Sequence, residues 1–377
     1  MSCCNSGLCN AQTLKPQILA VILDLDGTLL DTERATKDVF KEFLAKYGKV
    51  LDMEREEKKA DGMTLKDSSA AIVKDYDLPL TPDQYIQEII PMHQEKWMYV
   101  RALPGATRLI KHLYNHGIPL ALASNSLREY IDKKISHQKG WKECFTVILG
   151  SDQVKAGKPS PDLFEEAAKR MGVDPSQCIV IEDSLVGVKA ANAAKMEVVA
   201  VPPRSETDFS SLANIVLHSL LEFEPDLWGL PPFEDWVDNA LPIEPIYLSG
   251  QYVNGFLHDV TEDGTHSLPN QVFGVFFGCA YAEVDKQRIS KVLVWIGNER
   301  CSRTHQKKIQ MHLVDETDVV SYASNQQMTL ELFGYIRFLT GKESGCFDTK
   351  LLEEYKSIAR ASMDLPKFTQ NSHLLSE

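Results

Sequence analysis

The sequence has no apolar run long enough to cross a membrane and no recognisable secretory leader. Basic residues are also in short supply, because 40 lysines and arginines stand against 53 aspartates and glutamates, for a formal net charge of −13. Such a chain repels nucleic acids and anionic membranes unless a local basic patch compensates, and the sequence shows none. We therefore expect a cytoplasmic protein that binds neither nucleic acid nor membrane. The sequence identifies no protein partner.

Cysteine pairs with the spacing of metal ligands are missing from the body of the chain. The eight cysteines are scattered, which suits a reducing compartment better than a disulfide framework. Only Cys3, Cys4 and Cys9 lie close together, within residues 1–14, which we predict to be a disordered N-terminus. A frayed terminus explains this cluster better than a lipid anchor or a weakly held metal.

What the sequence does have is an alternation of short apolar runs with helical patterns over its first 220 residues. The apolar runs that predict buried strands are 18–23, 118–126, 144–152, 178–184 and 197–202, and helical patterns cover 105–117, 161–171 and 190–194. This rhythm predicts an α/β fold, a doubly wound parallel sheet with helices on both faces, in residues 15–31 and 103–220. Residues 32–102 carry apolar residues at helical spacing among charged ones, which predicts a helical insert.

The composition changes after residue 220. Residues 221–245 contain repeated prolines and acidic-aromatic clusters, which predicts a linker rather than a core element. Residues 246–377 contain short β-branched and aromatic runs, such as "QVFGVFFGCAYAEV" and "ISKVLVWIG", and a helical pattern near 349–361. We expect a small all-β barrel there, closed by that helix.

Three polar clusters directly follow predicted strands, and a fourth precedes a helix. They are Asp24 and Asp26 with Thr28, Ser124 with Asn125, Glu182 with Asp183, and Lys158 in the segment "AGKPSPD". In a parallel sheet such positions meet at the carboxyl ends of the strands, where these folds bind ligands. Asp24 and Asp26 also lie on the same side of a strand and would repel each other without a cation between them.

Each residue type has a chemical task at such an edge. Asp24 can attack phosphorus to form an acyl phosphate, and Asp26 can protonate the departing alkoxide and later deprotonate the attacking water. The candidates for binding the phosphate are Thr28, Ser124, Asn125 and Lys158. Lys158 should also lower the pKa of Asp24 and keep this nucleophile ionised.

The same edge holds candidate metal ligands. Asp24, Asp183 and the backbone carbonyl of Asp26 form a hard, oxygen-rich set that suits Mg²⁺, and Glu182 could join them directly or through water. Taken singly, each cluster has an ordinary explanation as a turn, a helix cap or a solvated strand end. Their joint appearance, in order and at strand ends, favours a catalytic site.

The segments "DLDGTLLD", "ASNS", "GKPSPD" and "VIEDSLVGVKAA" resemble the four motifs of the haloacid dehalogenase-like hydrolase superfamily, and the resemblance covers about residues 15–230. It implies a phosphatase with an aspartyl-phosphate mechanism and Mg²⁺, and a helical cap at about residues 32–102. A cap that closes over the site would exclude water and select the substrate.

Nearly the whole chain is also similar to the plant bifunctional riboflavin kinases/FMN phosphatases, including the connector segments "WGLPPFEDW" and "LPIEP". This resemblance implies FMN as the favoured substrate, hydrolysed to riboflavin. The C-terminal half departs from riboflavin kinases in two places. A Pro-Thr-Ala-Asn segment is missing between Gly250 and Gly274, and Gln310 stands where the family has a glutamate base. A neutral amide cannot accept the proton, so we predict that this half is inactive as a kinase.

Several alternatives stay open at this point. Similar phosphatases act on pseudouridine 5'-phosphate, glycerol phosphate or sugar phosphates, and a phosphomutase can use the same motifs. The second half could retain riboflavin kinase activity, or the protein could be a non-catalytic flavin-binding or scaffold protein. Tyr252, Trp295 and Phe333 could pack in a core or stack on a flavin ring. The intact catalytic motifs argue against a protein without activity.

Overall fold

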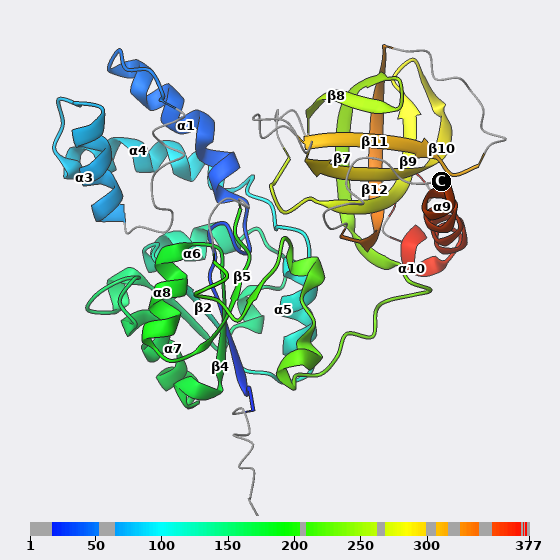
Figure 1. The fold of residues 1–377 in the computed structure, drawn as a ribbon. Coiled ribbons are helices and arrows are strands. Elements are labelled where there is room, and N and C mark those ends of the chain that lie inside the picture. The colour runs from blue at the N-terminus through cyan, green and yellow to red at the C-terminus, as the bar shows by residue number, and fades with distance from the viewer. Residues whose placement is uncertain are drawn as a thin grey trace, which may run out of the picture.

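The computed structural model describes residues 17–52, 65–203, 209–261, 268–298, 307–315, 325–338, 349–370, 372 and 374. These residues form an α/β part with a helical cap, and a β-barrel beside it (Figure 1). The segment 1–14 with Cys3, Cys4 and Cys9 lies outside the described residues. Among the described helices, none has the length and apolar character needed to cross a membrane.

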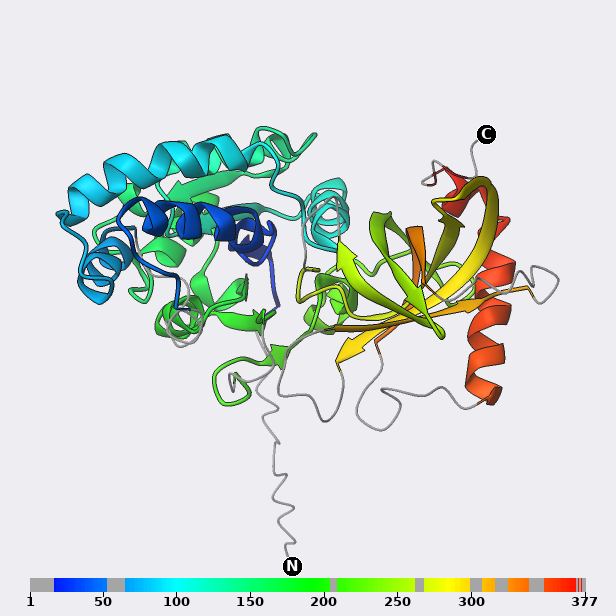
Figure 2. The ribbon, with the colours of Figure 1, turned by 90° about the horizontal axis from the view of Figure 1, so that it is seen from above.

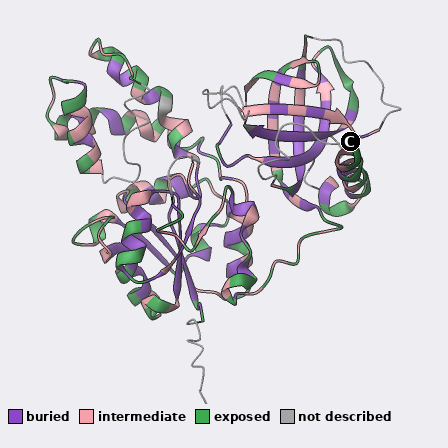
Figure 3. Cartoon of the chain, in the orientation of Figure 1, coloured by how far each residue is buried: buried purple, intermediate pink, exposed green. Residues whose placement is uncertain are grey.

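Six parallel strands form the central sheet, in the order β3-β2-β1-β4-β5-β6. Their bounds are β1 Ala20–Leu23, β2 Leu120–Ser124, β3 Val147–Gly150, β4 Cys178–Glu182, β5 Glu197–Ala200 and β6 Ile215–Val216. Every residue of β1 to β4 is buried, because helices cover both faces of the sheet (Figure 3). The parallel order confirms the predicted doubly wound fold class.

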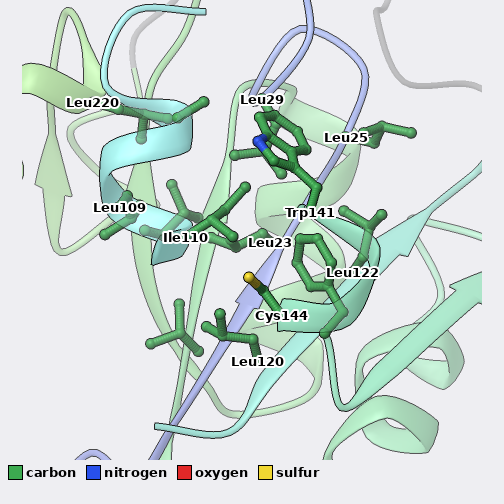
Figure 4. Packing of buried hydrophobic residues seen from close by; sticks show 14 of the residues in the cluster. Leu23, Leu25, Leu29, Leu109, Ile110, Leu120, Leu122, Trp141, Cys144 and Leu220 are labelled. Atoms are coloured by element: carbon green, nitrogen blue, oxygen red, sulfur yellow. The ribbon is translucent and has the colours of Figure 1, made fainter. Parts of the chain in front are cut away.

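Alternating residues of β1 enter two separate hydrophobic layers. Helices α5 Ala106–Asn115 and α6 Arg128–Ile135 complete the layer on one face, and α7 Asp162–Met171 and α8 Leu185–Ala193 complete the layer on the other. The connections contain three 3₁₀ helices, η1 Lys142–Cys144, η2 Ser151–Gln153 and η3 Pro175–Gln177. Leu23 faces the first layer, where it packs near Ile110 and Leu122 (Figure 4). Ala20 and Ile22 face the second layer. A register shift by one residue would send each side chain of β1 into the other layer, so both layers would have to repack.

The predicted helical insert forms a cap above the carboxyl end of the sheet (Figures 1 and 2). Its helices are α1 Thr32–Lys46, α3 Leu65–Asp75 and α4 Pro82–Trp97. They share a hydrophobic cluster of their own, in which Phe43 packs edge-on against Tyr85 with 5.0 Å between ring centroids. A reciprocal capping box between Thr81 and Gln84 starts α4. The cap is therefore a separate layer over the sheet edge.

A closed antiparallel barrel follows, with strand order β10-β11-β8-β7-β12-β9. Its strands are β7 Leu241–Val253, β8 Phe256–Thr261, β9 Gly274–Ala282, β10 Asp285–Asn298, β11 Lys307–Leu313 and β12 Gln326–Arg337. The connector contains η4 Leu220–Glu222 and η5 Pro225–Trp228, and β7 begins inside the stretch that the sequence assigned to the linker. The sequence pattern did not reveal β7, because Pro242, Pro245 and Gly250 interrupt its apolar alternation.

The barrel has an inner core and an outer hydrophobic layer. The outer layer lies under α9 Thr349–Met363 and α10 Pro366–Thr369, and α9 confirms the predicted closing helix. Trp295 and Phe333 belong to this layer and are 2% and 0% exposed. Both side chains are therefore core aromatics in this structure, whereas Tyr252 is half-buried beside the inner core.

Candidate active site

The eight residues singled out from the sequence come together at the carboxyl edge of the sheet. Asp24 follows β1, Ser124 ends β2, and Glu182 ends β4. The other five are Asp26, Thr28, Asn125, Lys158 and Asp183. Seven of the eight line one cavity of about 310 Å³ beneath the cap, and Thr28 donates a hydrogen bond from its hydroxyl to Asp183.

Lys158 holds two carboxylates of this cavity together. Its Nζ donates to Asp24 Oδ1 at 2.5 Å and to Glu182 Oε1 at 3.1 Å. β1 and β4 are neighbours, so the sheet places Asp24 and Glu182 side by side. The side chains of Lys158 and Glu182 are only 1% exposed. An ion pair at this depth is screened little by water or salt.

Asn125 fixes the segment that carries Lys158. Its Nδ2 donates to the backbone carbonyl of Lys158 at 3.1 Å, and its Oδ1 accepts from the Lys158 backbone amide at 2.8 Å. These two bonds tie the end of β2 to the loop before α7. Ser124 donates instead to Asp26 Oδ2 at 3.2 Å. In this structure the side chains of Thr28, Ser124 and Asn125 therefore all bond to other residues of the site.

The cluster around Asp24 carries more negative charge than Lys158 offsets. Burial and the nearby Glu182 raise the pKa of Asp24 to about 7, although Lys158 pulls it downward. Burial, Glu182 and Asp24 also raise the pKa of Asp183 well above its usual value. The expectation that Lys158 gives Asp24 a lowered pKa is therefore wrong for the net shift, which is upward. The lysine acts in the expected direction, but burial and the neighbouring carboxylates outweigh it.

The donor set of this cluster fits a hard divalent cation. Oxygen atoms of Asp24, Glu182 and Asp183 all lie within 4.8 Å of one another, and Mg²⁺ prefers carboxylate oxygens. Glu182 is the most heavily engaged of the three. Its Oε1 accepts from Lys158 and from the Ser184 hydroxyl, and its Oε2 accepts from the Asp183 backbone amide at 2.7 Å. Asp24 and Asp183 are therefore the better candidates for direct ligands.

Asp26 has a different environment from Asp24. Lys134 Nζ donates to Asp26 Oδ1 at 2.7 Å, and Ser126 Oγ donates to Oδ2 at 2.8 Å. Burial alone would raise the pKa of Asp26, but Lys134 and the hydrogen bonds from Ser126 and Thr32 outweigh burial and lower it. The pKa values of the two motif aspartates therefore shift in opposite directions. The shift favours the protonated form of Asp24 and the carboxylate form of Asp26.

Sequence reasoning missed Lys134. This lysine lies on α6 with Ile131 and Ile135, and all three are buried. A lysine on the apolar face of a helix is a usable signal, since charged side chains are seldom buried unless they are paired. Its partner Asp26 lies 108 positions earlier, so only the tertiary structure identifies the pair.

The cap closes the cavity with aromatic and polar side chains that the motifs did not identify. Trp97 of α4 packs against Tyr130 with 5.0 Å between ring centroids, and Lys134 Nζ lies 5.2 Å from the centre of the Trp97 ring. His93, also on α4, has its pKa lowered to about 4 by burial and by Lys134. A neutral histidine offers one hydrogen-bond donor and one acceptor at neutral pH.

Comparison with known proteins gives this site a family. A family model described as haloacid dehalogenase-like hydrolase matches residues 21–201, which contain all eight site residues. The "Bifunctional riboflavin kinase/FMN phosphatase" of Arabidopsis thaliana is 39% identical over 372 residues, which cover 96% of this chain and 97% of that protein. This chain belongs to the haloacid dehalogenase-like hydrolases.

Other relatives are similar to little more than half of the chain. The "(DL)-glycerol-3-phosphatase 1, mitochondrial" of Arabidopsis thaliana is 36% identical over 226 residues, 58% of this chain and 76% of that protein. The "Probable pseudouridine-5'-phosphatase" of Drosophila melanogaster is 37% identical over 220 residues, 57% of this chain and 95% of that protein. This haloacid dehalogenase-like hydrolase is a phosphatase, as the motifs implied, and its similarity to the plant bifunctional enzyme extends over nearly the whole chain.

Lys134→Met should lower kcat for phosphate release about 10- to 100-fold, because Asp26 loses the ion pair that orients it. The matched control is Lys133→Met, since Lys133 is the neighbouring residue on α6 and pairs with Glu129 at the surface. We expect the control to stay within about twofold of wild type. Steady-state phosphate release measures both variants, and equal kcat values would rule out a role for Lys134 in the site.

Proposed function

We propose that this protein is a Mg²⁺-dependent phosphomonoesterase that forms an aspartyl-phosphate at Asp24 and hydrolyses FMN to riboflavin. The observation that carries the proposal is the buried pair of Asp24 and Lys158 at 2.5 Å, in a cavity that also contains Asp26 and Asp183. An attacking carboxylate, a second carboxylate that carries protons and a lysine for the phosphoryl oxygens are the groups that this reaction needs.

The reaction divides between the two aspartates. In the first step an oxygen of Asp24 forms a bond to phosphorus while the bond from phosphorus to the ester oxygen breaks. Asp26 gives its proton to that oxygen, which leaves as an alcohol. In the second step Asp26 takes a proton from water, the water oxygen bonds to phosphorus, and the acyl-phosphate bond breaks to release phosphate and regenerate Asp24.

The environment of Asp26 suits both steps. Lys134 and Ser126 favour its carboxylate form, which is the form that deprotonates water. A doubly negative phosphate ester in the cavity would raise the pKa of Asp26, because a nearby like charge disfavours the carboxylate. Substrate binding would therefore promote the protonated form that the first step requires.

Asp24, Asp183 and the backbone carbonyl of Asp26 are the groups that would hold Mg²⁺ in this proposal. When bound, the ion offsets negative charge on the transferring phosphoryl group. Glu182 would contribute through Lys158, whose ammonium group it holds at 3.1 Å. Its role is then to position the lysine rather than to bind the ion.

The four candidates for phosphate binding divide into two pairs. Ser124 and Lys158 would donate hydrogen bonds to the phosphoryl oxygens, where negative charge increases during transfer. Thr28 keeps Asp183 in place with a hydrogen bond at 3.1 Å, and Asn125 clamps the backbone of Lys158. The second pair would therefore act mainly by orienting the side chains that contact the substrate.

FMN is the favoured substrate because the Arabidopsis protein named for FMN is similar to this chain over nearly its whole length. The cavity offers the aromatic and apolar walls of Trp97, Tyr130 and Ile90, and a neutral His93 for hydroxyl groups of the leaving alcohol. The second candidate is a smaller ester, glycerol phosphate or pseudouridine 5'-phosphate, after which other relatives are named. The chemistry at Asp24 and Asp26 would be the same for each.

We also propose that the barrel has no riboflavin kinase activity. Gln310 lies on β11 opposite Trp295 of β10, and its Oε1 is buried without a hydrogen-bond partner among the described residues. An amide there cannot take a proton from a hydroxyl group, and the loss of a general base costs on the order of 10²- to 10⁴-fold in rate. The burial of Trp295 and Phe333 in the outer hydrophobic layer of the barrel supports a packing role for that layer.

Asp24→Asn should lower phosphate release by about 10⁴-fold or more, since an amide cannot form the acyl phosphate. Wild-type protein with Mg²⁺ should show a higher kcat/KM for FMN than for glycerol 3-phosphate, pseudouridine 5'-phosphate or a sugar phosphate. Asp226→Asn, at an exposed aspartate of η5, is the control. Wild-type activity in Asp24→Asn would refute the mechanism, whereas a higher kcat/KM for another ester would change only the substrate.

The Asp24→Asn variant also isolates the barrel, because it cannot hydrolyse FMN that the barrel makes. With riboflavin, ATP and Mg²⁺ it should form no FMN above the protein-free background, as measured by chromatography with fluorescence detection. Gln310→Glu in the same variant should leave this result unchanged, because the Pro-Thr-Ala-Asn segment of riboflavin kinases is still missing between Gly250 and Gly274. FMN formation by Asp24→Asn would show that the chain is bifunctional.

A further inference from the structure

The barrel reaches the phosphatase site through Gln271. This residue lies in the segment before β9, and its Nε2 donates to the backbone carbonyl of Gly27 at 3.1 Å. Gln271 is 5% exposed, so the contact is shielded from water. The two residues are 244 positions apart, and Gly27 stands between the motif residues Asp26 and Thr28. The hydrogen bond therefore joins the barrel directly to the catalytic loop, residues 24–28.

Gly27 is a sensitive point of this loop. Its φ of +89° is a conformation that side-chain-bearing residues rarely adopt, and a Cβ atom there would lie 2.1 Å from Asp183 Oδ2. Its amide donates to the Leu30 carbonyl at 2.9 Å, and the next residue, Thr28, bonds to Asp183 at 3.1 Å. A rotation of the peptide after Gly27 would disturb Asp183 on one side and Asp26 on the other.

A well-anchored turn presents Gln271 to the loop. Lys307 of β11 donates from Nζ to the carbonyls of Pro269 and Val272, the latter at 2.6 Å. The Val272 amide closes the turn on the Pro269 carbonyl at 3.0 Å. Leu268 and Val272 belong to the inner core of the barrel. The barrel, and not the α/β part, therefore sets the position of the donor on Gln271.

Further contacts dock the barrel against the α/β part beside this hydrogen bond. Phe338, which follows β12, stacks on His218 with 3.8 Å between ring centroids, and Phe273 lies 5.4 Å from Phe338. Leu221 belongs to the inner core of the barrel, while the preceding Leu220 belongs to the core of the α/β part. Two consecutive residues thus enter two cores, which limits movement between the parts.

We propose that Gln271 is a positioning residue of the phosphatase, and that the barrel is a structural support for the catalytic loop. This inference rests on the proposed phosphomonoesterase function. The side-chain amide of Gln271 bonds to the Gly27 carbonyl and so holds the peptide that joins Gly27 to Thr28, without touching the substrate. A barrel without kinase activity then still has a task in the reaction.

Two variants of the full chain, Gln271→Ala and the isosteric Gln271→Glu, test this proposal. Both should lower kcat about 3- to 30-fold and change KM less than about twofold, because the loop loses a donor while substrate contacts remain. Glu should be at least as damaging as Ala, since a carboxylate sets a second acceptor against the Gly27 carbonyl. Gln287→Ala, at an exposed glutamine of β10, should behave as wild type.

Hydrogen–deuterium exchange of the same proteins gives a readout that does not depend on activity. Peptides covering residues 24–31 should exchange faster in Gln271→Ala, while barrel peptides and the midpoint of urea unfolding stay unchanged. A merely structural role would lower the midpoint and leave the kcat of the folded protein at its wild-type value, and that result would overturn the proposal. If wild type releases no phosphate from any ester, the proposed function fails, and unchanged loop exchange in both variants would then overturn the positioning role separately.

Discussion

One buried lysine among three buried carboxylates is the constraint on which this site depends. The neighbouring strands β1 and β4 deliver Asp24 and Glu182 side by side, and Lys158 bridges them. Removing one partner of a buried pair leaves an uncompensated charge and typically costs about 3 to 5 kcal/mol, so the bridge is a strong structural requirement. Asp183 adds a third carboxyl group that the lysine does not offset, and burial and the other two carboxyl groups raise its pKa well above the usual value. Burial and this surplus of carboxyl groups together raise the pKa of Asp24, and the surplus fits the cluster to a divalent cation.

Three parts of the chain contribute to the environment of the two motif aspartates. In the α/β part, the sheet edge surrounds Asp24 with acidic groups and α6 places Lys134 beside Asp26. The cap supplies the walls that contain His93 and Trp97. The barrel reaches the loop between the aspartates through Gln271. The site is therefore a product of the whole chain, although the groups proposed for the chemical steps all lie within the haloacid dehalogenase-like part.

The sequence predicted the α/β sheet because strands that are buried on both faces appear as short apolar runs, as in 18–23 and 178–184. It predicted the eight site residues because strand ends of a parallel sheet converge on one edge. It could not predict the partners of Lys134 and Gln271, which lie 108 and 244 positions away. Nor could it predict the net shift in the pKa of Asp24, since the depth of burial that outweighs Lys158 is a property of the folded chain.

Urea unfolding of the metal-free protein at different pH values most directly tests the surplus of buried carboxyl groups around Lys158. The pKa of Asp24 is raised to about 7 and that of Asp183 is raised as well, so the folded state keeps protons that the unfolded state loses near pH 4. These groups therefore lower the free energy of unfolding as the pH rises from about 4 to about 8. In urea with a chelator, Asp183→Asn should be more stable than wild type at about pH 8, and the difference should shrink towards about pH 5. An Asp183→Asn variant no more stable than wild type at the higher pH would contradict the account.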